Sequence, residues 1–221
     1  MAHRVSLRYL VVKLAASAEE VVSQLRGSAT TSFPEALVKG VETFRRQLTA
    51  VGVITGTAMA PTLNGSSLTQ PDAVEQFLMR LLPRPAARRT VFDGDVVALT
   101  SPLPGSPGSS HQIMVRRVAA LEGDEMVSDE PEVDGSFRIP DGHCWVLADN
   151  ESLVPPAVID SRTFGPLPLS NIIGRVMYAA RSETDHGPVE NSDAGMASDA
   201  PVLEAELDLD RLVGTSDQEE S

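Results

Sequence analysis

The chain of 221 residues contains one cysteine and one tryptophan, and aromatic residues make up only 4% of it. A single cysteine, Cys144, excludes an internal disulfide and any metal site built from several thiolates. With so few aromatic side chains, we expect an aliphatic core, and the apolar fraction of 42% is typical of a globular protein. The sequence also lacks an uninterrupted apolar run of the roughly 20 residues that cross a bilayer.

Basic residues are scarce, and negative charge is concentrated at the C-terminal end. The net charge is −13, and residues 182–221 carry −11 of it, with 12 acidic residues and one arginine. The remaining 181 residues hold 19 acids and 17 bases, which gives the body no electrostatic basis for binding nucleic acid. The one basic cluster is interpreted as a solvated loop, in preference to an anion or lipid contact, and consists of Arg80, Arg84, Arg88 and Arg89.

The character of the sequence changes near residue 50 and again near residue 182. Apolar residues at helical spacing predict two helices, one reaching about Arg26 and one from Pro34 to Leu48. Short β-rich runs then alternate with Gly, Pro, Asp and Asn. These runs are Val51–Ile54, Val91–Leu99, Ile113–Ala120, Cys144–Leu147 and Ile172–Tyr178. We expect a helical region over residues 1–50, a mostly β domain over 51–181, and an acidic, partly disordered extension over 182–221.

Both flanking regions contain segments suited to docking. The first predicted helix carries Arg4, Arg8 and Lys13 before its first acidic residue. This pattern is typical of an organellar targeting helix, of a helix that docks on a partner, or of one packed on its own domain. An apolar-acidic pattern between Val202 and Val213 leaves open docking on the body or on a partner.

Five sequence blocks resemble, in identity and order, the S26 signal peptidases, in particular their mitochondrial inner-membrane branch. The blocks are GTAMAPTL (56–63), FDGDVVAL (92–99), VRRVAALEGDEMV (115–127), IPDGHCWVLADN (139–150) and IDSRTFGPLPLSNIIGRV (159–176). The resemblance implies the mostly β fold of that family and serine endopeptidase chemistry. No group of residues has metal-ligand spacing and no phosphate-binding glycine loop occurs, so we expect no metal and no other cofactor.

The three catalytic roles of that family fall on residues that cannot perform them. Its chemistry needs a serine nucleophile, a lysine base and a serine that orients the lysine. Carried over by motif, these positions are Ala58, Arg116 and Val158. A methyl group cannot attack a carbonyl, and a guanidinium stays protonated at physiological pH. Three linked losses predict a protein that does not cleave peptides.

The other residues of these blocks are expected to be structural or to line a vestigial cleft. A buried polar network should brace the former active-site loop, since buried polar groups need partners. Its predicted members are Asp149, Asn150, Asp160, Ser161 and Arg162. Met59 and Pro61 are expected to line the old cleft, and the sequence does not decide whether that cleft accepts an extended peptide.

A second resemblance reaches residue 210. Segments such as DHGPVENS and APVLEAELDLD resemble a plant and green-algal group of S26-like proteins with degenerate catalytic residues. This implies a mitochondrial inner-membrane protein, with the chloroplast left open. Because residues 1–50 supply no membrane helix, attachment would be peripheral or through partners.

These features together predict a catalytically inactive structural or assembly subunit whose partners are other protein subunits of a membrane complex. One alternative is an active signal or presequence peptidase with a displaced nucleophile, drawn from Thr57, Thr62, Ser66 or Ser67. Thr57 is the weakest of these, because alternation along a strand would point it away from the face of residue 58. Another alternative is a module that binds peptides without cutting them.

Overall fold

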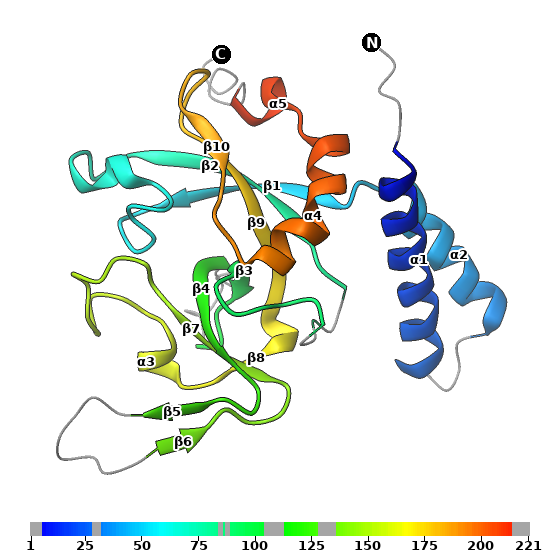
Figure 1. The fold of residues 1–221 in the computed structure, drawn as a ribbon, viewed down its shortest axis with the longest axis horizontal. Coiled ribbons are helices and arrows are strands. Elements are labelled where there is room, and N and C mark those ends of the chain that lie inside the picture. Colours follow the sequence, from blue (N-terminus) through cyan, green and yellow to red (C-terminus); the bar gives the residue numbers. More distant parts are fainter. Residues whose placement is uncertain are drawn as a thin grey trace.

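The computed structural model describes residues 6–27, 32–83, 86, 89–103, 113–127 and 136–213, and its fold is mostly β, as the sequence predicts. A curled antiparallel sheet forms the body, with a helical hairpin beside it and two C-terminal helices against it (Figure 1). The hairpin consists of α1 (Leu7–Gly27) and α2 (Phe33–Arg45), close to the predicted bounds. The C-terminal helices are α4 (Asp193–Glu206) and α5 (Leu209–Val213).

The main sheet has the strand order β1-β2-β9-β3-β4-β7-β8, with β10 paired to β9. Its strands are β1 (Thr49–Thr55), β2 (Val74–Leu81), β3 (Val96–Thr100), β4 (Ile113–Leu121), β7 (His143–Leu147), β8 (Leu167–Pro168), β9 (Ile172–Ala180) and β10 (His186–Pro188). A separate small hairpin pairs β5 (Glu125–Val127) with β6 (Ser136–Arg138). All five β-rich runs of the sequence overlap strands, whereas β2 was not predicted.

The core is aliphatic, and the side chains of β3 belong to two of its clusters. Val96 and Ala98 belong to one buried cluster, while Val97 and Leu99 belong to the other. Because successive side chains of a strand point to opposite faces, the two clusters lie on the two sides of the sheet. The site described below is built where β4 and β7, the next strands in the order, meet the loop that follows β1.

The helical hairpin is closely packed because one helix offers small residues to the other. Ser32 caps α2, the side chain of Glu35 accepts from the backbone N–H of Ser32 at 2.9 Å, and Pro34 lies in the first turn, where its missing N–H is tolerated. Gly40 faces α1 so closely that an added Cβ would lie 2.5 Å from Val21. The sequence had left open whether the first helix packs on its own domain; here Tyr9 is buried against the body.

Helix α4 is fixed to the sheet by a buried ion cluster around Arg175 of β9. The Arg175 guanidinium donates to Asp199 of α4 at 2.6 Å and to Asp95 at 2.5 Å. Asp199 also accepts from Arg80 of β2 at 2.5 Å, so the interpretation of Arg80 as part of a solvated loop is wrong. Of the other arginines in that cluster, Arg89 is exposed, and Arg84 and Arg88 lie outside the described residues.

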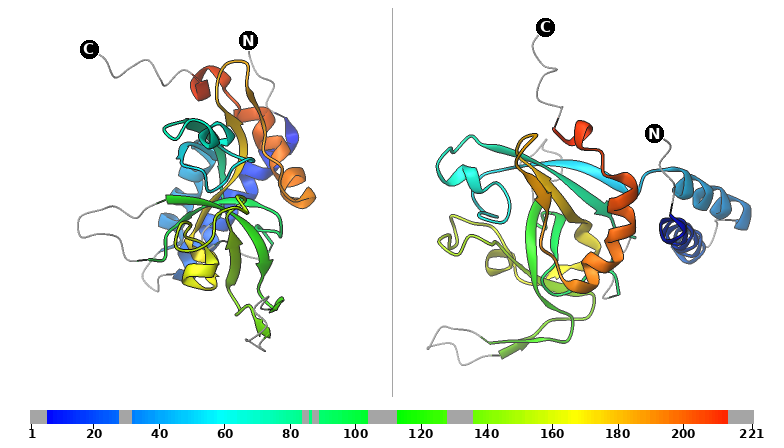
Figure 2. Two further views of the ribbon diagram at one scale, coloured as in Figure 1. Left: turned by 90° about the vertical axis from the view of Figure 1, so that its left-hand side faces the viewer. Right: turned by 45° about the horizontal axis from the view of Figure 1, so that its top comes forward.

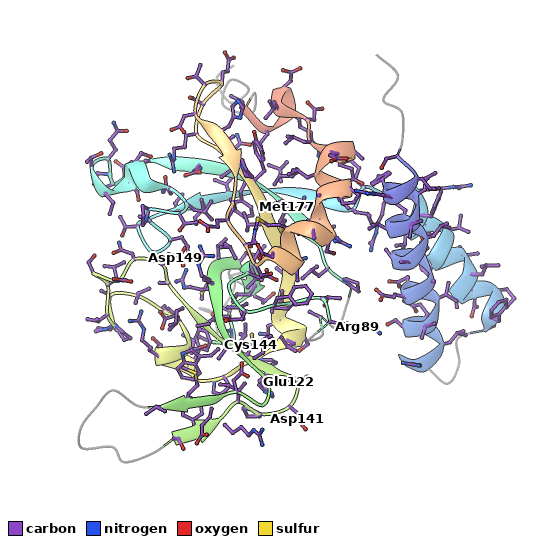
Figure 3. All side chains as sticks on the ribbon, in the orientation of Figure 1. Arg89, Glu122, Asp141, Cys144, Asp149 and Met177 are labelled. Atoms are coloured by element: carbon purple, nitrogen blue, oxygen red, sulfur yellow. The ribbon has the colours of Figure 1, made fainter. Side chains whose placement is uncertain are left out.

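Apolar contacts and one carboxylate complete the docking of the C-terminal helices. Val202 and Leu212 are fully buried in a cluster with Met177, which lies beside α4 in Figure 3. At the end of α4, Glu206 accepts from the backbone N–H of Thr49 at 3.0 Å and from the hydroxyl of Tyr9 at 2.5 Å. The sequence left open whether the apolar-acidic pattern between Val202 and Val213 docks on the body or on a partner. In the structure it lies against the body.

The replacement Asp199→Ala should lower the free energy of unfolding by about 3–5 kcal/mol, because it leaves the buried Arg175 guanidinium with one carboxylate in place of two. Glu204→Gln on the exposed side of the same helix is the matched control and should change stability by less than about 0.5 kcal/mol. Urea unfolding of the full chain measures both changes. Equal effects of the two variants would contradict the role assigned to the ion cluster.

Candidate functional site

The loop that carries residue 58 leaves the strand before it reaches that residue. Gly56 has φ +76°, a left-handed value that glycine adopts readily, and residues 58–64 form turns. The expectation that residues 57 and 58 alternate as in a strand is therefore wrong. Asn150 holds this loop: its side-chain amide donates to the Thr57 carbonyl at 2.9 Å, and its backbone N–H donates to the Ala58 carbonyl at 3.1 Å.

A buried carboxylate braces the same loop from its other end. Glu75 of β2 accepts from the backbone N–H of Asn64 and from the Arg181 guanidinium, the latter at 3.0 Å. The Asn64 amide donates to the carbonyls of Gly56, at 3.1 Å, and Ala73, at 2.9 Å. Asn150, which follows β7, and Glu75, in β2, thus hold the loop at two places, which sets the position of Ala58. The sequence analysis missed this brace, since nothing in the motif links Glu75 to it.

The two residues expected to line a cleft have different environments. Met59 is fully buried and packs with Leu63 and Val115 in the core cluster on its side of the sheet. The structure therefore places Met59 in the core and not in a cleft, as expected for a large apolar side chain that gains most when removed from water. Pro61, two residues further, is exposed.

Arg116 lies in the middle of β4, opposite Val97 of β3, and its side chain is 8% exposed. Its Nε donates to the Ile159 carbonyl at 2.9 Å, and one terminal nitrogen donates to the Val115 carbonyl at 2.5 Å. Burial lowers the pKa of the Arg116 guanidinium, an effect that the charge of Asp160 opposes. A group with an ordinary pKa above 12 still carries its proton at neutral pH.

Val158 precedes Ile159, which Arg116 contacts, so the two positions that the family resemblance assigns to the lysine and its orienting serine are brought together. Its side chain is buried, and its carbonyl accepts from the Thr163 hydroxyl at 3.3 Å. An apolar side chain at this position cannot hydrogen-bond to a cationic head group. Ala58 joins the group through Asn150, which donates to the Ala58 carbonyl. Ala148, two residues before Asn150, donates its N–H to Asp160, two residues after Val158.

Asp160 and Ser161 pin the end of β7 to the short helix α3 (Ser161–Phe164). The Asp160 carboxylate caps α3 by accepting from the Arg162 backbone N–H at 3.0 Å, and it accepts from the Ala148 N–H at 3.2 Å. The Arg162 guanidinium, 35% exposed, donates to the same carboxylate at 2.6 Å. The Ser161 hydroxyl accepts from the Val146 N–H at 2.9 Å. Burial acts to raise the pKa of Asp160, but these donors outweigh it and the pKa is lowered.

Asp149 takes a separate partner that the sequence analysis did not identify. Arg117 donates to both of its carboxylate oxygens, at 2.9 and 2.7 Å, in the two-pronged geometry that suits a guanidinium. The same side chain donates to the carbonyls of Gly94 and Glu190, at 2.7 and 3.0 Å. Figure 3 shows Asp149 where the loops after β1 and β7 approach each other. The available signal was the second arginine of VRRV, to which the sequence analysis gave no partner.

Two hydroxyl groups near residue 58, those of Ser67 and Thr62, have hydrogen-bond partners within the protein, one close and one at long distance. Ser67 is buried and donates to the carbonyl of Asn64 at 2.6 Å, and Thr62 accepts from Arg117 at 3.4 Å. Within the described residues, no lysine or histidine hydrogen-bonds to either hydroxyl. The thiol of Cys144 lies in the core, where burial raises its pKa to about 12. In the same part of the chain, no group of three or more His, Cys, Asp or Glu could hold a metal ion.

Known proteins similar to this chain are named as organellar peptidases or their subunits, although no family model matches it. It is 41% identical over 157 residues to "Mitochondrial ATP-independent inner membrane protease subunit 2" of Arabidopsis thaliana, covering 71% of this chain and 70% of that protein. It is 31% identical over 133 residues to "Mitochondrial inner membrane protease subunit 2" of Danio rerio, covering 60% and 64%. It is 28% identical over 155 residues to "Thylakoidal processing peptidase 1, chloroplastic" of Arabidopsis thaliana, covering 61% and 43%.

The replacement Asp160→Asn should destabilise the protein by about 1–3 kcal/mol at neutral pH, because it removes a charged acceptor that several N–H groups share. The pKa of Asp160 is lower in the folded chain than its unfolded value of about 3.9. Its ionised form therefore contributes stability above that pH, and the contribution is lost as pH falls through the folded pKa. The variant should lose less stability on acidification than the parent.

Urea unfolding between neutral pH and about pH 3 tests this expectation. Asp141→Asn is the control, because Asp141 is exposed and its replacement should leave the acid limb of the stability curve unchanged. An acid limb that is equally steep in the parent and in Asp160→Asn would contradict the assignment.

Proposed function

This chain belongs to the S26-type family of mitochondrial inner membrane protease subunits, and on that premise we propose that it is a catalytically inactive member. Its proposed role is that of a structural or assembly subunit in a mitochondrial inner-membrane complex. The names of its relatives support a location at that membrane and partners that are other protein subunits. Within the described residues, no helix combines the length and apolar character needed to cross a bilayer. The chloroplast is the alternative location, supported by the thylakoidal relative.

The chemistry at residue 116 is the observation that carries this proposal. By resemblance to the family, this position belongs to a lysine that accepts a proton as a neutral amine. Here a buried guanidinium occupies it and uses its Nε–H to donate to the Ile159 carbonyl. A protonated donor cannot serve as general base, and the alanine methyl at position 58 offers no nucleophile. With the apolar Val158 at the third position, none of the three catalytic positions carries a residue that can perform its role in the family.

The intact framework supports a role that depends on shape and not on cleavage. Asn150, Asp160 and Ser161 keep hydrogen bonds that hold the former active-site segments in place. Such bonds stabilise a particular backbone arrangement whether or not a peptide is cut. The C-terminal extension adds the Asp199 carboxylate to the buried ion cluster, so the chain retains a fixed surface on which partners can assemble.

A second candidate, a module that binds peptides without cleaving them, is favoured by one feature of the sheet. Strand β1 is at one end of the strand order, and it runs directly into the loop that carries Ala58. An edge strand can accept an extended peptide as an additional strand. This candidate requires measurable peptide affinity that depends on β1 and on exposed residues of the loop, such as Pro61.

The purified full chain should not cleave presequence peptides, and Ala58→Ser with Arg116→Lys should give little or no activity. The double variant still lacks a hydroxyl at residue 158 to orient the new lysine. Loss of a nucleophile or its base lowers the rate by several orders of magnitude. Fluorogenic presequence peptides and mass spectrometry of the products measure this, with the triple variant that adds Val158→Ser for comparison.

Cleavage by the unmodified chain that Thr62→Val abolishes would establish the displaced-nucleophile alternative and contradict the proposal. Thr184→Val is the matched control for that replacement, because Thr184 is an exposed residue of the turn between β9 and β10 and should leave any cleavage unchanged. Peptide binding without cleavage, lost on replacing Pro61 with a bulky residue, would instead establish the binding module. Neither binding nor cleavage is the result that the subunit role predicts.

A further inference from the structure

Helix α1 packs on the protein with part of its apolar side chains and leaves a second apolar stripe exposed to solvent. Tyr9 and Lys13 are its two buried residues, and the Lys13 ammonium lies 5.4 Å from the centre of the Tyr9 ring. The exposed large side chains of the helix are all apolar or basic. The apolar ones are Leu7, Val11, Leu14, Val22 and Leu25, with Leu7 77% exposed. A helix packed only on its own domain buries its apolar stripe, so the exposed stripe indicates that another surface binds to the outer side of α1.

Helix α2 adds a second exposed apolar stripe. Ala36, Gly40 and Thr43 are buried toward α1. Exposed apolar side chains follow on the adjacent face, and they are Phe33, Leu37, Val38 and Val41, with Phe33 63% exposed. We call these four residues and the five of α1 the hairpin face.

The two stripes lie on one side of the hairpin. On each helix, a rotation of about 100° per residue places the stripe about a quarter turn from the contact with the other helix. The sense of this rotation reverses between antiparallel helices, so both stripes turn to the same side. Figure 2 shows α1 next to α2 with α4 as its neighbour in the body. Since Tyr9 of α1 packs toward the body, the hairpin face lies on the side away from it.

Exposed arginines border the hairpin face. Arg8 and Arg26 lie one above the other along an edge of the α1 stripe, and Arg45 lies at the edge of the α2 stripe; all three are exposed. Within the described residues, none of the three forms an ion pair. The acids of the hairpin have other partners: Glu19 with Arg89, Glu20 with Gln24, Glu35 with the cap of α2, and Glu42 with Lys39.

We infer that the hairpin face docks on an anionic lipid surface, with its apolar side chains at the headgroup–acyl boundary and the three arginines among the headgroups. An apolar stripe bordered by arginines is the pattern of a helix that lies in a membrane interface. A second copy of the chain fits less well, because a two-fold contact would bring the same arginines together without acids to pair them. The inference rests on the membrane location in the proposed function and is independent of the loss of catalysis.

Flotation of the purified full chain with vesicles tests the inference. The chain should float with vesicles of phosphatidylcholine and phosphatidylserine, less with phosphatidylcholine alone, and less as salt rises. The double replacement Leu14→Gln, Val22→Gln should weaken binding at least about tenfold. Each replacement of Arg8, Arg26 or Arg45 by Gln should weaken it about fivefold on the anionic vesicles only.

Leu68→Gln is the matched control, because Leu68 is 59% exposed and lies on the body away from the hairpin. It should leave vesicle binding unchanged. Unfolding curves of all variants should coincide, since every replaced side chain is exposed. Failure of the parent chain to float, or equal floating of the Leu14, Val22 double variant, would overturn the inference.

Two further outcomes would assign the hairpin face to a protein partner and likewise overturn the inference. One is a stable dimer in solution that the Leu14, Val22 double variant abolishes. The other is recovery of the hairpin face in a cross-link to another subunit of a native membrane complex. The cross-link to another subunit would leave the proposed subunit role intact. A chain found outside the organelle membranes would contradict both the subunit role and the docking on lipid.

Discussion

A guanidinium in the interior of a protein must be neutralised and given acceptors, and this requirement at Arg175 organises the molecule. Asp95, from the turn before β3, supplies one carboxylate, and Asp199, from α4, supplies the other. The backbone carbonyl of Thr90 accepts a further hydrogen bond at 3.1 Å, and the ring of Phe92 lies 5.7 Å away. Because one acceptor comes from the C-terminal extension, α4 belongs to the core of the fold and is not an appendage. The position of α4 then determines where Glu206 meets the helical hairpin.

The segments around Ala58, Arg116 and Val158 follow a similar rule, with each polar group satisfied by the backbone of a neighbouring segment. Asn150 holds the loop of Ala58, Asp160 holds the end of β7, and Arg116 donates to the segment after Val158. The guanidinium of Arg116 thus takes part in the architecture at the position where the family resemblance expects a titrating amine. A lysine there would leave acceptors without the same donors, so Arg116→Lys would also disturb the structure.

The sequence predicted the mostly β fold and the strands rich in Val and Ile, because those residues suit a pleated and half-buried surface. It missed β2, whose Glu, Gln, Leu, Met and Arg are good helix formers and join the sheet only through pairing with β1 and β9. The motifs assign the family's catalytic roles to the positions of Ala58, Arg116 and Val158, but they could not show that Met59 is a core residue. Asp199 and Glu75 act through residues distant in the sequence, and no local pattern reveals such pairs.

The size of the assembly that contains the chain under native conditions most directly tests the claim that it is a subunit of a membrane complex. The chain would be tagged at its natural expression level, the organelles solubilised gently, and the bands that migrate with it on native gels identified by mass spectrometry. The account predicts that it migrates in stoichiometric amount within a large membrane complex and that the complex keeps its composition when Ala58 is replaced. A free species that cleaves presequence peptides would contradict it.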